Sequence, residues 1–397
     1  MSCRFFACWL CSTLVFSFIP EGVHAVELPT PYSFDAGPLG KLEISGGADG
    51  YVYGLTGAGS DTNKGLLGTS TNAGAEFLNG LVELQKSEGL VQFTFEAGGV
   101  NSLTLGTRPK DPTAQKWSTG PFRSAYITIA PSQNLTISAG QIGSLEGYES
   151  GIDWKNFNML TTALWDVENA QSVGVTATYT YGPFAGSITF SDGFDTNVWN
   201  YLQLLASYTA NDDNSVTLFG ATNLGSTGLG AKFYGSATRP YSSSTVAAAG
   251  AANLVNSSVV GGYYSFTPGN LTIVPEVQYV WSTRNPGVGL NGYSSHFGAA
   301  LFVNYKINAS DFSIGGWFEY FTSNGTQGWF LNPGAQGVGL AAGPTWSPGW
   351  AKKHLFVRGD VGALHLINVG TPGSSGYGSS GTGRNQAIFL VEAGVLF

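Results

Sequence analysis

The sequence predicts an all-β chain that folds as a single transmembrane antiparallel β-barrel. Three observations support this fold class. The last strand alternates apolar residues up to a terminal aromatic. Only 11% of the 397 residues are charged, against about 25% in soluble domains, yet beyond the N-terminus there is no run of about 18 apolar residues. Strand-like segments recur along the whole chain. Because a closed barrel is the only alternative to helices for pairing every backbone group in lipid, these observations favour a barrel.

The C-terminal stretch, 387–397, alternates along its whole length. Successive side chains of a strand point to opposite faces, so one face carries only apolar residues, namely Phe389, Val391, Ala393, Val395 and Phe397. Such a face suits lipid, with an aromatic at the interface. An ordinary strand of a soluble β-sandwich stays open as the alternative. The terminal Phe397 resembles the C-terminal signature of bacterial outer-membrane proteins, and this resemblance implies recognition by the barrel-assembly machinery.

The N-terminus has the layout of a secretory signal peptide. One positive residue, Arg4, precedes an uncharged apolar run over 5–19, Pro20 follows, and small residues allow cleavage after Ala25. We therefore predict a cleaved signal over 1–25 and a barrel domain over 26–397, with 28–40 as a lead-in. The mature chain then has no cysteine, which excludes disulfides and Cys-ligated metals, because the three cysteines all lie in the signal: Cys3, Cys8 and Cys11.

The charge balance excludes one class of partner. Removing Arg4 and Glu21 from 17 basic and 25 acidic residues leaves 16 against 24, so the net charge remains −8. A nucleic-acid-binding protein would carry a basic patch or stripe, and this sequence has none. We expect contact with outer-membrane lipid and small polar solutes instead.

Period-two patterns predict the strands. In 271–281, for example, Ile273, Val277 and Tyr279 oppose Glu276 and Gln278. The polar faces carry charges of both signs, as a wet lumen allows. The same alternation occurs in 80–85, 91–96, 173–181, 297–306 and 355–363.

Short and long links alternate between these segments, which is typical of short periplasmic turns and long outer loops. The links predict about 16 strands, an even number between 14 and 18. Counts from the two ends disagree by one strand at 216–237: either this is one strand broken by glycines, giving 16, or a further strand lies near 239–256, giving 18. Tryptophans near the inferred strand ends suggest aromatic girdles, with core tryptophans as the alternative: Trp154, Trp165, Trp199, Trp281, Trp317, Trp329, Trp346 and Trp350.

One stretch carries a family resemblance. Ala139-Gly140-Gln141 is followed by Gly147-Tyr148-Glu149, by the aromatic and Asn-rich 153–158, and by a hairpin that returns to Gly193-Phe194-Asp195. This order resembles the OmpL-like family of bacterial outer-membrane β-barrel porins, and 77–99 looks like the first hairpin of that family. Gln141 stands where the family pattern has Lys. The resemblance covers about 75–195 well, and it implies a pore without indicating a solute.

The link over 142–170 is the candidate constriction loop. It is rich in acids, and the region before it is rich in bases. If the loop folds into the barrel, these groups would face each other and set a transverse field across a narrow pore. A solvated outer loop is the alternative. The acidic candidates are Glu146, Glu149, Asp153, Asp166 and Glu168, and the basic candidates are Arg108, Lys110, Lys116 and Arg123.

Weaker candidates lie on the polar faces of the predicted strands, where each would be a charge of the lumen wall. They are Glu83, Glu96, Glu276, Lys306, Arg358, Asp360 and Glu392.

Motifs for enzymatic chemistry are lacking. No HExxH or GxSxG pattern occurs, and the mature chain has three widely spaced histidines. We therefore expect an outer-membrane channel for passive diffusion of small hydrophilic solutes and ions, with no cofactor, no catalytic residue and no metal. A structural or adhesive barrel with a plugged lumen, an outer-membrane lipase and a soluble secreted β-protein are the alternatives. Association as a homotrimer stays open.

Overall fold

A computed structural model describes residues 26–109, 122–169, 171–193, 199–225, 232–234, 243–245, 257–286, 290–308 and 310–397. Within these ranges, none of the helices combines the length and the apolar character needed to cross a bilayer.

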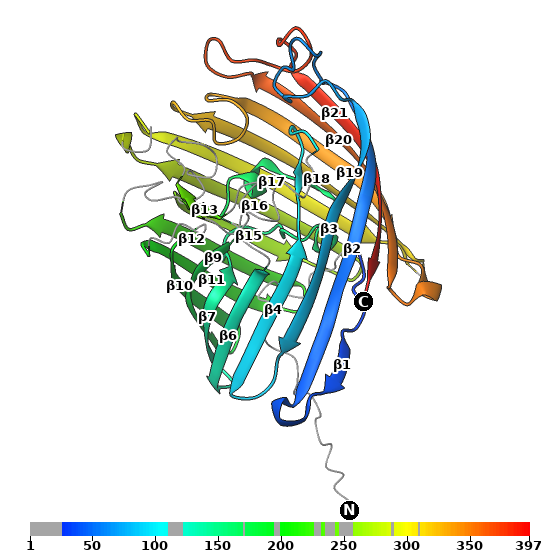
Figure 1. Cartoon of the computed structure of the whole chain (residues 1–397), viewed down its shortest axis with the longest axis vertical. Helices are drawn as coiled ribbons and strands as arrows, with labels where there is room; N and C mark the ends of the chain where they lie inside the picture. The colour runs from blue at the N-terminus through cyan, green and yellow to red at the C-terminus, as the bar shows by residue number, and fades with distance from the viewer. Residues whose placement is uncertain are drawn as a thin grey trace, which may run out of the picture.

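Sixteen strands form a closed antiparallel barrel, and each pairs with its neighbours in the chain (Figure 1). The ring closes where the last strand pairs with the first. Antiparallel closure leaves no free sheet edge in the membrane, which explains why every strand is paired on both sides. In order the strands are β2 (Lys41–Leu55), β3 (Ala73–Lys86), β4 (Val91–Gly99), β6 (Phe122–Ser132), β7 (Leu135–Gly143), β9 (Gln171–Tyr181), β10 (Phe184–Ser191), β11 (Tyr201–Asn211), β12 (Asn214–Asn223), β15 (Ser258–Phe266), β16 (Leu271–Ser282), β17 (Ser294–Lys306), β18 (Phe312–Asn324), β19 (Gln336–Trp346), β20 (Leu355–Asn368) and β21 (Asn385–Leu396).

The seam between β2 and β21 runs to the last residue. The register goes from Gly47 opposite Leu396 to Leu55 opposite Ile388. Beyond it, Gly46 and Phe397 exchange two backbone hydrogen bonds of 2.9 Å. A Cβ on Gly46 would lie 2.8 Å from the Phe397 ring, so glycine makes room for the terminal aromatic. This pairing of the last strand with the first closes the predicted barrel.

Side chains alternate between lipid and lumen as the sequence predicts. Along β21 every second residue is exposed, including Phe389 at 55% and Val395 at 54%, while Glu392 and Leu390 point inward and are buried. The pattern repeats along β20, where Val361 points outward and Arg358 and Asp360 point inward.

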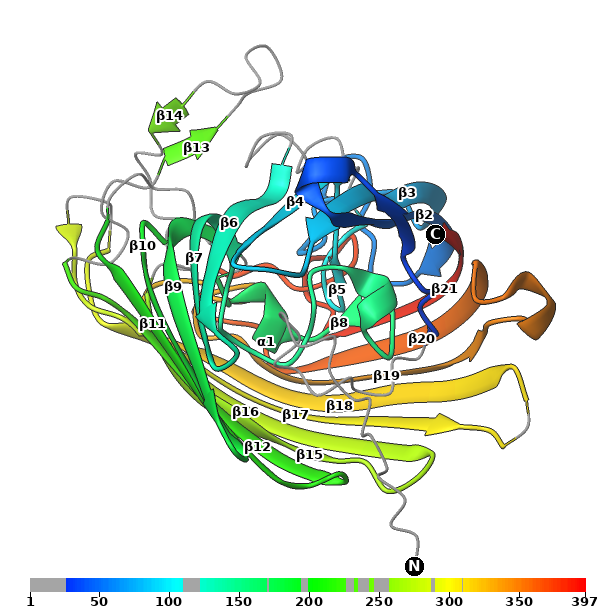
Figure 2. The ribbon, with the colours of Figure 1, turned by 90° about the horizontal axis from the view of Figure 1, so that it is seen from below.

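Strand number 16 is confirmed, although not as drawn from the sequence. β12 ends at Asn223 and the next strand of the ring is β15, which begins at Ser258, so the barrel strand within 216–237 covers only its first part. Between these two strands, β13 (Lys232–Tyr234) and β14 (Ser243–Thr245) pair with each other and lie outside the ring (Figure 2). The remaining strands are β1 (Tyr32–Asp35), which pairs with the start of β2, and the two-residue β5 (Leu103–Thr104) and β8 (Leu160–Thr161).

The girdle interpretation is wrong for three tryptophans. Trp154, Trp317 and Trp329 are at most 4% exposed and pack inside the molecule. Their positions near inferred strand ends did not distinguish the lipid face from the lumen face. Trp199 and Trp350, at 48% and 75% exposed, are consistent with the girdle position.

Candidate functional site

The link between β7 and β9, residues 144–170 and here named loop 3, folds into the barrel. It contains a 3-10 turn (Asp153–Lys155), β8 and the short helix α1 (Ala163–Asp166). Figure 2 looks along the barrel and shows α1, β5 and β8 inside the ring of strands. β8 pairs in parallel with β5 from the preceding loop, Leu103 opposite Leu160. The inward fold that the constriction hypothesis required is therefore present.

Apolar side chains of loop 3 pack against the barrel wall. Met159, Leu160 and Leu164 are at most 1% exposed and belong to one cluster with wall residues. Among others, the wall contributes Phe302 of β17, Trp317 of β18, Phe321 of β18, Leu364 of β20 and Leu390 of β21. Burial of each large side chain contributes about 1.5–3 kcal/mol, so this contact holds the loop against the wall.

Carboxylates of the wall satisfy the backbone of the loop. Asp360 accepts hydrogen bonds from the N–H groups of Met159 (2.7 Å) and Leu160 (3.1 Å). Glu319 accepts one from Ala163 (2.7 Å), and Glu276 accepts one from Tyr148 (3.0 Å). A buried loop cannot pair its N–H groups within a sheet, so each would cost free energy if left without a partner. These inward charges therefore position the loop rather than line open water.

Arg358 of β20 is the central cation of this contact and is fully buried. Its Nε and Nη2 lie 2.8 and 2.7 Å from Glu392 Oε2, and its Nη2 also pairs with Asp153 of loop 3. Its Nη1 donates to the carbonyls of Asp153 and Asn156, both at 3.2 Å. The planar guanidinium thus joins two strands and the loop, as a single lysine ammonium could not.

A buried amide extends this network to the other side of the seam. Asn79 of β3 donates to Asp153 and, at 3.1 Å, to Asp49 of β2. Its backbone N–H also donates to Asp49 (2.9 Å). Asp49, Asp153 and Glu392 offer three carboxylate oxygens within 4.8 Å of one another, and the contacts of Arg358 and Asn79 account for this grouping without an ion.

Glu146 and Glu149, which belong to the loop itself, hold its fold. Glu146 accepts hydrogen bonds from the Asn169 N–H and the Tyr201 hydroxyl, both at 2.9 Å. Glu149 accepts from the N–H of Thr162 (3.1 Å) and from its hydroxyl. Burial raises the pKa of each of these glutamates to about 7, although the hydrogen bonds they accept oppose the shift.

The Gly147-Tyr148-Glu149 segment that carries the family resemblance serves this docking at every position. Gly147 has φ +72°, and a Cβ there would lie 2.1 Å from the Glu168 carboxylate, so no other residue fits without a shift. The Tyr148 ring packs against Tyr263 and Phe302, with centroids 5.4 and 5.2 Å away. Glu149 caps Thr162 as described.

The remaining sequence candidates of the constriction lie in different places. Asp166 accepts a hydrogen bond from the Thr104 hydroxyl (3.3 Å). Arg108 donates to the Gly68 carbonyl of the first outer loop (3.4 Å), and Arg123 pairs with Glu96 (2.6 Å). Lys110 and Lys116 lie outside the described residues. Glu146, Glu149, Asp153 and Glu168 are buried, whereas Asp166 is only partly buried. Their effect on permeating ions stays a prediction.

A second, more open group of charges lies between loop 3 and β3–β6. Lys155 is exposed, unlike its neighbours Trp154 and Asn156, and it acts electrostatically on Glu83 of β3. Glu96 and Arg123 also act on Glu83, and Tyr126 of β6 lies within reach of the same groups. The Arg123 side chain is 21% exposed. This eyelet group (Glu83, Glu96, Arg123, Tyr126 and Lys155) contains two acids and two bases.

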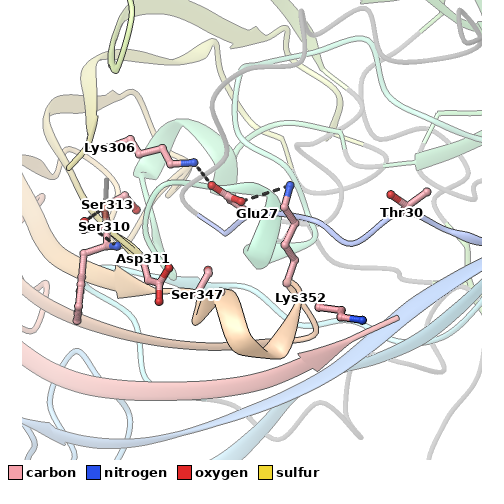
Figure 3. Close-up of a pocket in the computed structure, with 11 residues that line it drawn as sticks. Glu27, Thr30, Lys306, Ser310, Asp311, Ser313, Ser347 and Lys352 are labelled. Atoms are coloured by element: carbon pink, nitrogen blue, oxygen red, sulfur yellow. Dashed lines mark hydrogen bonds and ion pairs between the residues drawn. The ribbon is translucent and has the colours of Figure 1, made fainter. Parts of the chain in front are cut away.

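Glu27 lies at the end of the barrel where β17 ends and the β19–β20 turn lies. Glu27 reaches toward Lys306 at the end of β17, as Figure 3 shows, and lies 3.3 Å from Lys353 of the β19–β20 turn. These residues border a pocket of about 340 Å³ together with Thr30, Asp311 and Ser347. Val26 is fully buried against Ile152 and Trp154 of loop 3. Lys306, expected on the lumen wall, therefore lies at the rim.

Sequence reasoning missed three residues that hold loop 3: Asp49, Asn79 and Glu319. Glu319 had a usable signal, because it stands alone between aromatic residues in 317–321, at an inward position of a strand. Asp49 lies in a glycine-rich stretch without clear alternation, and an inward asparagine such as Asn79 looks like any lumen residue.

Comparisons with known proteins agree with this architecture. The sequence profile of the family described as "Putative beta-barrel porin-2, OmpL-like" matches residues 41–397. No curated protein matches the sequence. Among solved structures, the anion-selective porin from Comamonas acidovorans has a TM-score of 0.59 at 10% identity, covering 90% of this chain and 99% of its own. The outer membrane channel DcaP of Acinetobacter baumannii has a TM-score of 0.57 at 11% identity, with 93% and 100% covered.

At such low identity the solved structures show a shared fold and nothing more. The family match covers the whole barrel, including the segment over 139–195 from which the resemblance was first drawn. The chain belongs to the OmpL-like β-barrel porin family, and it is an outer-membrane channel protein.

Proposed function

We propose that this barrel is a channel for passive diffusion of small hydrophilic solutes and ions, exported by means of a signal peptide over 1–25. The observation that carries the proposal is the eyelet group. Most of loop 3 is buried against the wall, whereas its Lys155 is exposed and acts electrostatically on Glu83, beside Glu96 and Arg123.

The eyelet group explains how such a channel would discriminate among permeating solutes. Its acids and bases lie side by side and nearly cancel, so we expect weak selectivity by charge and a local field that orients dipolar solutes.

Reversal of one eyelet charge tests the proposal. In a planar bilayer under a salt gradient, Lys155→Glu should shift the reversal potential toward cation selectivity. Two units of charge at roughly 6 Å in a water-like medium change the energy of a monovalent ion by about 1.4 kcal/mol. The permeability of a cation or an anion then changes by up to about tenfold at low salt, in opposite directions, and their ratio by up to about 100-fold. The matched control is Lys64→Glu, because Lys64 is exposed in the first outer loop. An equal shift in both variants, or none in either, would contradict the eyelet assignment.

A plugged structural barrel is the second candidate, and the apolar docking of loop 3 favours it. A plugged barrel would give no ohmic current steps, whereas a diffusion channel gives stable ones. Recognition of Phe397 by the assembly machinery also belongs to the proposal, since this residue completes the seam and its ring is 43% exposed. OmpT of Vibrio cholerae was solved in a trimer form. A homotrimer of this chain stays a prediction that crosslinking in membranes would check.

A further inference from the structure

Five buried carboxyl groups meet where loop 3 contacts the wall. Loop 3 contributes Glu146, Glu149 and Glu168, β16 contributes Glu276 and β18 contributes Glu319, with exposed fractions of 8%, 9%, 5%, 2% and 0%. Glu168 is within electrostatic reach of Glu146, Glu149 and Glu276, and Glu149 is within reach of Glu276 and Glu319. We name these five residues the carboxyl cluster.

The ionisable groups that face the cluster are acids and phenols. Loop 3 adds Asp166 and Tyr148, β11 adds Tyr201, β15 adds Tyr263, and the loop after β20 adds Tyr377. Six ion pairs occur in the described part of the chain, and none includes a member of the cluster. The nearby Arg358 is engaged by Asp153 and Glu392.

Hydrogen bonds compensate this burial incompletely. Glu146, Glu149, Glu276 and Glu319 each accept one or more, but Glu168 Oε2 and Glu319 Oε1 are buried without a partner among the described residues. An isolated buried carboxylate is strongly disfavoured, so such groups take up protons instead. Like charges at close range add to this cost, as in paired catalytic carboxyls.

We propose that the carboxyl cluster is a proton-dependent latch, which holds loop 3 against the wall at acidic pH and weakens that contact as the pH rises through neutrality. The contact itself is a property of the fold, whereas its effect on current rests on the proposed channel function. Loosening the loop would widen the path beside Lys155, so conductance should rise with pH.

The direction and size of the pH effect on docking follow from the two loop glutamates. Their pKa is raised from 4.5 to about 7 for both Glu146 and Glu149, so docking stability is fully present below pH 4.5 and is lost as the pH rises through 7. Between pH 5 and pH 8 the linkage changes the docking equilibrium by about 70-fold for each group. Burial raises the pKa of Glu168 as well, and this adds in the same direction.

Thiol labelling tests the latch without any transport measurement. The mature chain has no cysteine, so Leu164→Cys places a single thiol in the buried part of loop 3. Its labelling rate, divided by that of the exposed control Thr62→Cys to remove the pH dependence of thiol chemistry, should rise at least tenfold from pH 5 to pH 8. Added to the same background, Glu146→Gln, Glu149→Gln and Glu168→Gln together should reduce the rise, because glutamine keeps the shape of the neutral acid. Further substitution of Glu276→Gln and Glu319→Gln should remove the remainder. Glu88→Gln, an acid exposed in a periplasmic turn, should leave it intact.

A labelling ratio that stays flat between pH 5 and pH 8 would overturn the latch, and so would a rise that all five Gln substitutions leave unchanged. Current recordings separate the two proposals: channels that conduct equally at both pH values contradict only the latch, whereas absence of current at both contradicts the channel function.

Discussion

Replacement of Arg358 by methionine should release loop 3 from the wall. The substitution removes the three nitrogens that contact Glu392, Asp153 and the Asn156 carbonyl, and it leaves two fully buried carboxylates without their cation. Removing one partner of a buried ion pair typically costs about 3–5 kcal/mol. If that cost falls on the contact rather than on the barrel, the docking equilibrium shifts by roughly 150- to 5,000-fold.

Labelling of Leu164→Cys at pH 5.5 measures this release, because the thiol reacts only when the loop opens. Arg358→Met should raise the labelling rate by at least 100-fold relative to Thr62→Cys. Arg358→Lys should give a smaller increase, since lysine retains the charge but not the planar set of donors. Adding Asp153→Asn and Glu392→Gln to Arg358→Met should recover part of the protection by removing the unpaired charges. Labelling of Arg358→Met at the wild-type rate, in a barrel that still shows heat-modifiable mobility, would refute the role assigned to Arg358.

Two substitutions of glycine test other contacts. Gly147→Ala should weaken docking of loop 3 by about 1–2 kcal/mol from backbone strain, and the clash with Glu168 adds to this cost. The labelling rate of Leu164→Cys should then increase tenfold or more. Gly143→Ala, where a Cβ meets nothing within 4 Å, should show no increase. Gly46→Leu should displace the Phe397 ring and loosen the seam, so the folded form seen on a cold detergent gel should unfold at a lower temperature than the wild type. Gly54→Leu, in the same strand but with open space around it, is the control. Equal unfolding temperatures for Gly46→Leu and the wild type would contradict the packing described at the seam.

The barrel could be predicted because its determinants are local. Alternation in 173–181 or 355–363 depends on neighbouring residues only, and the last strand gives its outward face by the same rule. Loop lengths are also local. They predicted an even strand number, and they located the segment 216–237 where the counts from the two ends disagree. That segment misled because Val216–Asn223 forms a regular strand and the glycine-rich residues after it carry no period of either kind.

The interior could be predicted only in part, because its contacts join distant segments. The sequence marked loop 3 and its acids as candidates, but it left open whether the loop folds inward or stays a solvated outer loop. It could not show that Asp360 lies beside Met159, 201 residues away, or that Ala163 meets Glu319, 156 residues away. Acids and bases close in sequence therefore looked like natural partners. In the fold, Asp153 pairs with Arg358, while Arg123 pairs with Glu96 on the neighbouring strand.

Single-channel recording of the purified wild-type protein in a planar bilayer tests the central claim most directly. The account predicts stable, ohmic current steps with weak ion selectivity, which shifts toward cations when Lys155 is replaced by glutamate. A protein that shows heat-modifiable mobility and inserts into the bilayer, but gives no steps at pH 5 or pH 8, would contradict the claim and favour a plugged barrel.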